Sequence, residues 1–223
     1  MKSLTDQQKG SLLAFVAVMF ITPDSLFIRL SNLDTWGLVF YRGIIPFFTV
    51  FFGMLIIYKL NFFKILFNSS FHGIIYIATF SITNITFVVS IQNTNVANTL
   101  VMIATAPMLS AILGAIFLKE PPDRKTLISI IITFFAIIYI FFDSLKVGNF
   151  YGDILGFITA LGLAVGAITI RSAKTKNLVP AAVVGKLFVA SFALFFIESF
   201  TLIDKDLFIV PLMCICVLQY HLY

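Results

Sequence analysis

Long apolar runs alternate with short polar segments along the whole chain. A helix of about 20 residues crosses the roughly 30 Å hydrocarbon core of a bilayer. Helices that are apolar on every side suit lipid, where only their own backbone hydrogen bonds must be satisfied. The pattern predicts an all-α polytopic membrane protein with eight spans, at 10–30, 36–58, 72–91, 96–118, 126–142, 152–171, 180–202 and 207–223.

Composition agrees with this class of protein. The 223 residues are 60% hydrophobic and 11% charged, whereas a soluble domain carries about a quarter charged residues. The first run is too long for a secretory signal and has no small-residue cleavage site, so it is read as a span. Cys214 and Cys216 would point about 200° apart on a helix, which prevents a bridge. Without histidine or acidic neighbours they form no metal site, and the sequence predicts neither metal nor cofactor.

Lysine and arginine fall unevenly on the two sides of these spans. Three of the 15 lie on one side (Arg29, Lys146 and Lys205), and Arg42 and Lys186 lie inside spans. The N-terminus and the loops after the second, fourth and sixth spans hold the other ten: Lys2, Lys9, Lys59, Lys64, Lys119, Arg124, Lys125, Arg171, Lys174 and Lys176. Cytoplasmic loops collect positive charge, so we expect a cytoplasmic N-terminus in a multi-pass protein of the cell (inner) membrane. Basic residues spread over short loops form no patch for nucleic acid.

The fourth predicted span has a polar entrance and a proline in its middle. Amides and hydroxyls, Asn98 among them, occupy 92–99, and Lys119 and Glu120 end the span. Pro107 removes one backbone hydrogen bond and is expected to kink the helix, as is Pro23 in the first span. The segment is interpreted either as a membrane helix with a polar mouth or as an ordinary packed span with an interfacial cap.

The start of the chain is repeated in its later part. Residues 10–30 align with 152–172, which sets Arg29 over Arg171, and a two-residue shift sets Arg42 over Lys186. Five spans precede the second copy, so it crosses the membrane in the opposite direction. Inverted repeats are typical of transporters and place the substrate site near the midplane between the copies.

Five features together carry a resemblance to a known family: the duplication, Arg42 near the start of the second span, the Asn-rich entry to the fourth span, Pro107, and the closing Leu118-Lys119-Glu120. In these features the sequence resembles the EamA-type family of the drug/metabolite transporter superfamily. The resemblance covers nearly the whole chain and implies ten helices in two inverted five-helix repeats around a central cavity. Residues 10–142 would form the first repeat and 152–223 an incomplete second one. The second copy lacks counterparts of Pro107 and Glu120, and we expect two further helices in a complete protein.

Charged residues inside spans are the sharpest candidates for function. Asp24 lies well inside the first span, where an acidic group costs roughly 2.5–3.5 kcal/mol and must face protein or a wet cavity. We expect it to couple protons or bind a substrate ammonium; the alternatives are solvation at the outer interface or a static pair with Arg29. Arg42 and Lys186 either snorkel to the headgroups, or Arg42 binds a substrate carboxylate or pairs with Asp24 in one state of the cycle.

Polar and small residues complete the candidate site. Asn84 in the third span and Asn98 at the entrance of the fourth are expected to serve substrate or proton coupling, although Asn84 could instead bond between helices. Glu120 is interpreted as a solvated cap near Arg124. Gly162 and Gly166 lie beside a ridge of small residues at 152, 156, 160 and 164, which predicts close packing and a central sixth span.

The function predicted from these residues is secondary transport of a small metabolite or drug-like solute by alternating access. The chain has no GxxxxGK[ST] loop and no room for an ATPase domain. The alternatives are an integral membrane enzyme acting on a lipid-like substrate and a non-transporting subunit. Such an enzyme would need a cluster of acidic residues or histidines for metal or acid–base chemistry, and the only histidines are His72 and His221. The expected partners are the bilayer and a small-molecule substrate, and a homodimer is left open.

The expected topology can be tested by labelling. Lys64 and Lys176 follow the second and sixth spans, so single cysteines at both positions should react with a membrane-impermeant maleimide from the same face. A cysteine at Lys146, on the other side, is the control and should react from the opposite face. Reaction of positions 64 and 176 from opposite faces would disprove the inverted arrangement.

Overall fold

The computed structural model describes residues 23–59, 61–147, 150–174, 176–197, 200 and 205–218, and within them all regular structure is helical. The helices are α2 (Asp24–Leu30), α3 (Thr35–Tyr58), α4 (Asn61–Asn68), α5 (Ser70–Asn93), α6 (Val96–Ile103), α7 (Ala106–Phe117), α8 (Arg124–Val147), α9 (Phe150–Ala173), α10 (Val179–Ala193) and α11 (Asp206–Leu218).

Four described segments are long and apolar enough to cross a bilayer: Thr35–Ile57, Ser70–Asn93, Val96–Phe117 and Phe150–Ala173. They fall on the second, third, fourth and sixth predicted spans. The prediction of an all-α polytopic membrane protein is therefore confirmed. Of the first predicted span only the part from Pro23 onward lies in the described residues.

Side chains at the helix starts explain several boundaries. The Asp34 carboxylate accepts hydrogen bonds from the backbone N–H groups of Trp36 and Gly37, both at 3.1 Å, and so caps α3. Asn95 caps α6 in the same way. Asp123 precedes α8, and hydrogen bonds from the side chain and backbone of Thr126 hold the pKa of its carboxyl below the ordinary value. Each cap satisfies an N–H group that the helix itself leaves without a partner.

The fourth predicted span is divided at its proline. α6 ends at Ile103 and α7 begins at Ala106, with Pro107 in its first turn. A proline has no N–H to bond the carbonyl four residues earlier, so the ladder is broken there. The Thr105 hydroxyl donates to the Met102 carbonyl at 2.6 Å, which supplies a local partner at the break. The kink predicted at Pro107 is thus present as a full interruption.

Several boundaries differ from the sequence prediction, and α8 extends beyond both ends of the span expected at 126–142. The seventh span was expected to run to 202, but α10 ends at Ala193. Beyond the end of α10 the chain packs on α3, where Phe196 stacks on Trp36 with ring centroids 4.7 Å apart. The short helix α4 was not predicted; it buries Phe62 against Met54 and Val183.

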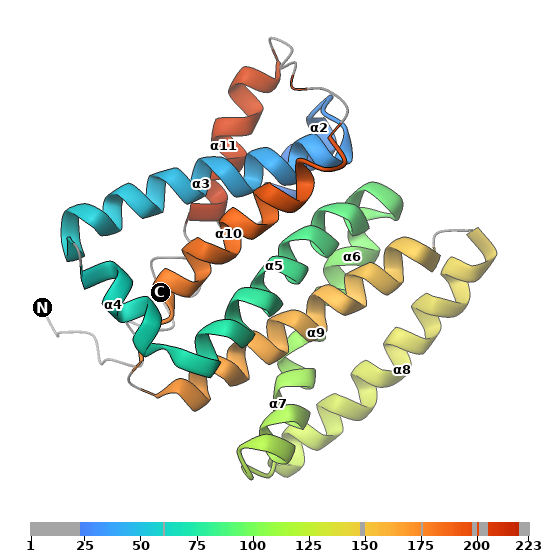
Figure 1. Cartoon of the computed structure of the whole chain (residues 1–223). Helices are drawn as coiled ribbons and strands as arrows, with labels where there is room; N and C mark the ends of the chain where they lie inside the picture. Colours follow the sequence, from blue (N-terminus) through green and yellow to red (C-terminus); the bar gives the residue numbers. More distant parts are fainter. Residues whose placement is uncertain are drawn as a thin grey trace, which may run out of the picture.

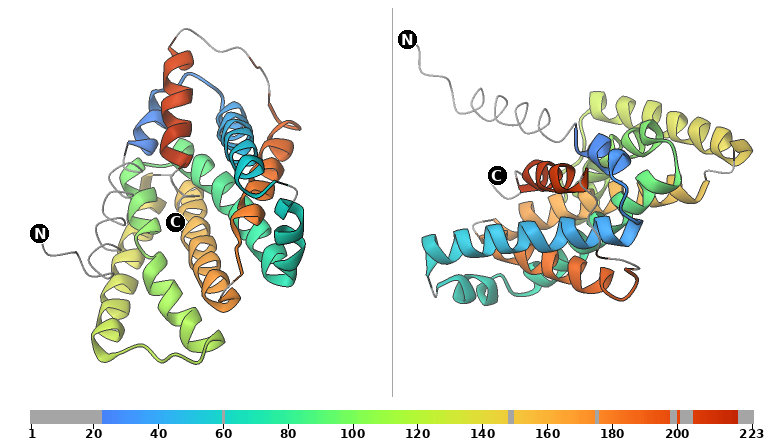
Figure 2. Two further views of the ribbon diagram at one scale, coloured as in Figure 1. Left: turned by 90° about the vertical axis from the view of Figure 1, so that its left-hand side faces the viewer. Right: turned by 90° about the horizontal axis from the view of Figure 1, so that it is seen from above.

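The long helices form a row in which α10 lies between α3 and α5, and α9 lies between α5 and α8 (Figure 1). α9 also packs against α6 and α7. The predicted central position of the sixth span is therefore confirmed. α11 lies beside α2 and α3, as the further views show (Figure 2).

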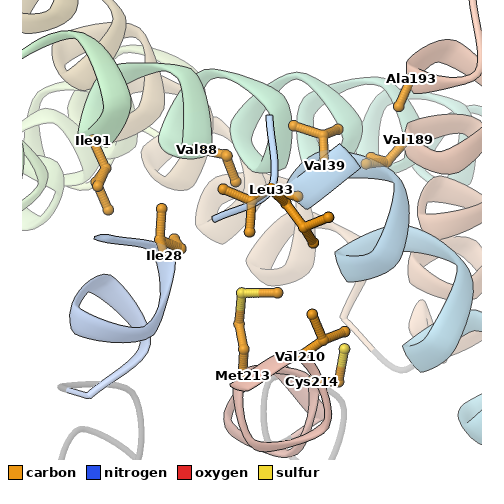
Figure 3. Packing of buried hydrophobic residues seen from close by; sticks show 11 residues of the cluster. Ile28, Leu33, Val39, Val88, Ile91, Val189, Ala193, Val210, Met213 and Cys214 are labelled. Atoms are coloured by element: carbon orange, nitrogen blue, oxygen red, sulfur yellow. The ribbon is translucent and has the colours of Figure 1, made fainter. Parts of the chain in front are cut away.

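The larger apolar core joins α2, α3, α5, α10 and α11. Figure 3 shows Val210, Met213 and Cys214 pointing from α11 toward Leu33 and Val39. Cys214 is 2% exposed and behaves as the small apolar residue that the sequence predicted. This core fixes α2 against α3 and α5, which determines the position of Asp24 at the start of α2.

Glycines allow the closest helix crossings. A Cβ on Gly43 of α3 would lie 2.8 Å from the backbone nitrogen of Ala190 and 3.0 Å from the carbonyl oxygen of Lys186, both on α10. A Cβ on Gly162 of α9 would lie 2.1 Å from the Thr83 hydroxyl oxygen of α5, in line with the predicted packing role. Because the Gly43 contact is to backbone, it cannot relax by rotating a side chain.

Gly43→Ala should therefore destabilise the fold by about 1–3 kcal/mol, the usual cost of overpacking. Gly53 lies on the same helix, and nothing lies within 4 Å of a Cβ built there. Gly53→Ala is the matched control and should be neutral or stabilise by up to about 1 kcal/mol, because alanine favours helix. Thermal unfolding of both variants in detergent micelles measures the difference. Equal melting temperatures would contradict the close α3–α10 crossing.

Candidate functional site

A cavity of about 500 Å³ lies between α5 and α9. Its wall also includes Ser25 of α2, Arg42 of α3 and Ile103 at the end of α6. Aromatic and polar side chains alternate along its α5 side: Tyr76, Phe80, Thr83, Asn84 and Phe87. The volume suits a small organic molecule, and an apolar wall with a few polar groups is typical of ligand sites.

Asp24 and Arg42 form a buried ion pair beside this cavity. Arg42 Nη1 donates to the Asp24 carboxylate. Their side chains are only 4% and 2% exposed, so neither charge is solvated at an interface. Asp24 therefore pairs with Arg42 and not with Arg29, whose guanidinium donates to the Thr94 carbonyl.

Lys186 occupies the neighbouring position on α10. It is 1% exposed, and its ammonium donates to the Asn84 side-chain oxygen at 2.7 Å. The Asn84 amide in turn donates to the Phe80 carbonyl at 2.8 Å, which orients its oxygen toward Lys186. Asn84 thus both lines the cavity and bonds between helices, so the two alternatives raised by the sequence are compatible.

Snorkelling to the headgroups is excluded for both cations. Arg42 lies about 10 Å along α3 from Thr35, and Lys186 lies about 10 Å along α10 from Val179, at about 1.5 Å per residue. Each packs instead over an aromatic ring, Arg42 over Phe87 at 5.3 Å and Lys186 over Phe80 at 5.2 Å. Such contacts favour a cation that has left water.

Two glycines next to the cations bring the three helices together. Gly43 adjoins Arg42 and lies against the Lys186 carbonyl of α10, as described above. Gly185 adjoins Lys186, and its carbonyl accepts a hydrogen bond from the Ser81 hydroxyl of α5 at 3.1 Å. A Cβ at Gly185 would lie 2.9 Å from the Phe80 ring. The sequence analysis missed both glycines, although Arg42-Gly43 and Gly185-Lys186 are adjacent pairs in the two aligned segments.

The remaining predicted site residues lie at different distances from the cluster. Gly162 and Gly166 line the cavity on the α9 side, where Gly162 lies against the Thr83 hydroxyl and a Cβ at Gly166 would lie 3.7 Å from the Tyr76 ring. Pro23 precedes α2, and the residues before it lie outside the described part of the chain. Asn98 lies away from the cavity lining, with its amide 3.4 Å from the Asp153 carboxylate.

Asp153 is a buried acid that the sequence analysis overlooked. It lies in the first turn of α9 and accepts a hydrogen bond from the Thr94 hydroxyl at 2.6 Å. A negative side chain at the start of a helix is favoured by the helix dipole. The sequence feature that could have identified Asp153 is an acidic residue directly inside the start of the sixth predicted span. Asp206 at the start of α11 is a similar case, and its carboxylate accepts a hydrogen bond from the Ser31 hydroxyl at 2.8 Å.

The polar entrance of the fourth span forms a second hollow of about 500 Å³. It is lined by Arg29 and by residues 92–96 at the turn between α5 and α6. On the opposite side of the bundle, Arg171 at the end of α9 pairs with Glu120. Glu120 is therefore solvated as predicted, but its partner is Arg171 instead of Arg124. Both side chains of this pair are more than half exposed, so it contributes little to stability.

More than half of the chain is similar to a known protein family. The family model described as EamA-like transporter family matches residues 8–142. The curated proteins and the solved structures give no match. The matched range contains Asp24, Arg42, Asn84 and the kinked α6–α7 segment.

The Asp24–Arg42 pair can be tested by a double-mutant cycle. Arg42→Gln leaves the Asp24 carboxylate buried without its cation, and such losses cost about 3–5 kcal/mol. Asp24→Asn strands the cation in the same way. The double variant should be less destabilised than the sum of the two singles, because it buries no unpaired charge. Melting temperatures in one detergent measure the coupling, and additive effects would show that the pair is not formed.

Proposed function

Because the chain belongs to the EamA-like transporter family, we propose that it is a secondary carrier that moves a small metabolite or drug-like solute across the membrane by alternating access. Membership makes it a membrane transporter-like protein of the drug/metabolite superfamily. The proposal adds the mechanism, a cell (inner) membrane location, a cytoplasmic N-terminus and proton coupling.

The observation that carries the proposal is the buried charge cluster beside the cavity. Arg42 lies about a third of the way into α3, which is long enough to span a bilayer, and it meets there Asp24 from the start of α2 and Lys186 from the middle of the shorter α10. Charges at such depth are costly and usually mark a substrate or ion pathway. This buried charge cluster, of which Arg42 lines a cavity of about 500 Å³, supports solute binding inside the membrane.

Helix contacts support the inverted repeats on which alternating access depends. If the copies at 10–142 and 152–223 are equivalent, α3 matches α10, α5 matches α11, and α2 matches the second half of α9. The contacts of α10 with α5 and of α9 with α5 then have counterparts in those of α3 with α11 and of α2 with α11. The α3–α10 contact is its own counterpart. A carrier built this way can exchange the roles of its halves around one site.

Proton coupling follows from the position of Asp24 in this scheme. While Asp24 is ionised, Arg42 holds it and α2 is tied to α3. Protonation of the carboxyl removes the attraction to the cation and frees the two helices to separate. The proton would then travel with the conformational change instead of through a fixed channel.

Flux measurements on Asp24→Asn test the proposal. Proteoliposomes containing the parent protein are first loaded in turn with a panel of small metabolites, to find the compound that is exchanged best. Uptake of this compound is then measured with and without a pH gradient. Asp24→Asn should lower gradient-driven uptake at least about tenfold, since the amide cannot carry the proton.

Asp123→Asn is the matched control. Asp123 is an exposed cap outside the spans, and asparagine caps a helix equally well, so its uptake should equal that of the parent. An Asp24→Asn variant that inserts normally and retains the parental response to the gradient would remove Asp24 from the mechanism. Absence of exchange by the parent protein for every compound would count against a carrier.

A further inference from the structure

The buried cluster contains more basic than acidic side chains. Among the described residues it contains one carboxylate, Asp24, and two bases, Arg42 and Lys186, and the buried Cys214 thiol also interacts electrostatically with Lys186. Lys186 is repelled by Arg42 and attracted by Asp24. With Asp24 and the two bases ionised, the cluster carries one uncompensated positive charge in an apolar bundle, and a buried charge without a counter-charge is costly.

The Asp24–Arg42 pair leaves part of the guanidinium available. Asp24 takes a hydrogen bond from Nη1, whereas Nε is buried and has no acceptor among the described residues. Arginine offers five donors in a planar fork, and the edge formed by Nε and Nη2 matches the two oxygens of a carboxylate. Arg42 itself lines the cavity. A carboxylate at this edge would give the Nε–H group an acceptor while Asp24 stays on Nη1.

Lys186 has a neutral partner in place of a counter-ion. Its ammonium donates to the Asn84 amide oxygen, and no carboxylate pairs with it in the described part of the chain. Asn84 lines the cavity, so Lys186 lies directly behind the cavity wall. An anion at Arg42 would supply the negative charge that Lys186 lacks.

The rest of the cavity suits an apolar body. Phe80 and Phe87 lie on the α5 side, and Ile103 and Ile170 contribute aliphatic surface. Leu163 and Ala167 add aliphatic surface on the α9 side. An apolar group can lie there between aromatic rings on one side and aliphatic side chains on the other.

From these contacts we propose that the cavity selects organic monoanions: a carboxylate bound by Arg42 and balanced by Lys186, joined to an apolar or aromatic body lying against Phe80 and Phe87. A cation would add to the excess positive charge, and a zwitterion would leave it unchanged. That such anions are the transported solutes rests on the proposed function, whereas their binding in the cavity does not depend on transport.

Four probes of similar size and different charge test the selection. Phenylacetate is the anion, 2-phenylethylamine the cation, phenylalanine the zwitterion and 2-phenylethanol the neutral compound. Binding to the purified full chain in detergent is measured by calorimetry and by the shift in melting temperature. Phenylacetate should bind at least tenfold more tightly than each of the other three and should raise the melting temperature.

Variants assign the binding to the cluster. Lys186→Gln keeps a donor for Asn84 but removes the charge, and it should weaken phenylacetate binding at least tenfold while leaving 2-phenylethanol unchanged. Lys176→Gln removes an exposed loop charge and should change neither. Arg42→Lys keeps the charge and removes the fork; it should also weaken phenylacetate, which keeps the test usable if Lys186→Gln does not fold.

Failure of this inference differs from failure of the carrier proposal. Tighter binding of the amine or the zwitterion, or phenylacetate binding that Lys186→Gln and Arg42→Lys leave intact, would overturn the anion site even if flux is observed. Anion binding that both variants weaken, in a protein that exchanges none of the probes in proteoliposomes, would support the site and count against the carrier.

Discussion

Holding two cations and one carboxylate in an apolar helix bundle is the constraint on which the rest of this structure depends. Each charge has a specific partner: Asp24 has Arg42, Arg42 also has the Phe87 ring, and Lys186 has Asn84 and the Phe80 ring. These partners come from α2, α3, α5 and α10, so the charges can be buried only where those four helices meet. Loss of one partner strands a charge in a medium that solvates it poorly.

Close backbone packing meets this constraint. Gly43 lets α3 approach α10 next to Arg42, and Gly185 lets α10 approach α5 next to Lys186. Small residues also drive helix association in lipid, where the hydrophobic effect gives no preference for a neighbouring helix over a lipid tail. The apolar core around Met213 and Leu33 then holds α2 in place, and with it Asp24. Packing and electrostatics therefore depend on the same crossings.

The sequence predicted the class of fold and most spans, because length and apolarity decide both. It also identified Asp24, Arg42, Lys186 and Asn84, since polar groups inside apolar runs are visible without coordinates. It did not predict which of them pair, because pairing depends on how helices far apart in sequence cross. The early end of α10 was missed for a related reason. An apolar sequence does not show whether it continues as a helix or leaves the helix to pack against another element, as Phe196 does on Trp36. Asp153 and Asp206 were missed because an acid at a span end resembles an ordinary cap.

The excess positive charge also bears on how occupancy could be linked to motion. An empty cavity next to an unbalanced cation is favoured in contact with water, because enclosing the cavity removes the nearby water that screens the buried charge of Lys186 without supplying a counter-charge. A bound carboxylate supplies that counter-charge, and the same cluster can then be enclosed at lower cost. A ligand shifts a conformational equilibrium only through its different affinity for the two states. On the proposed charge balance, that difference arises at Arg42 and Lys186, so a neutral solute of the same shape would occupy the cavity without favouring its closure.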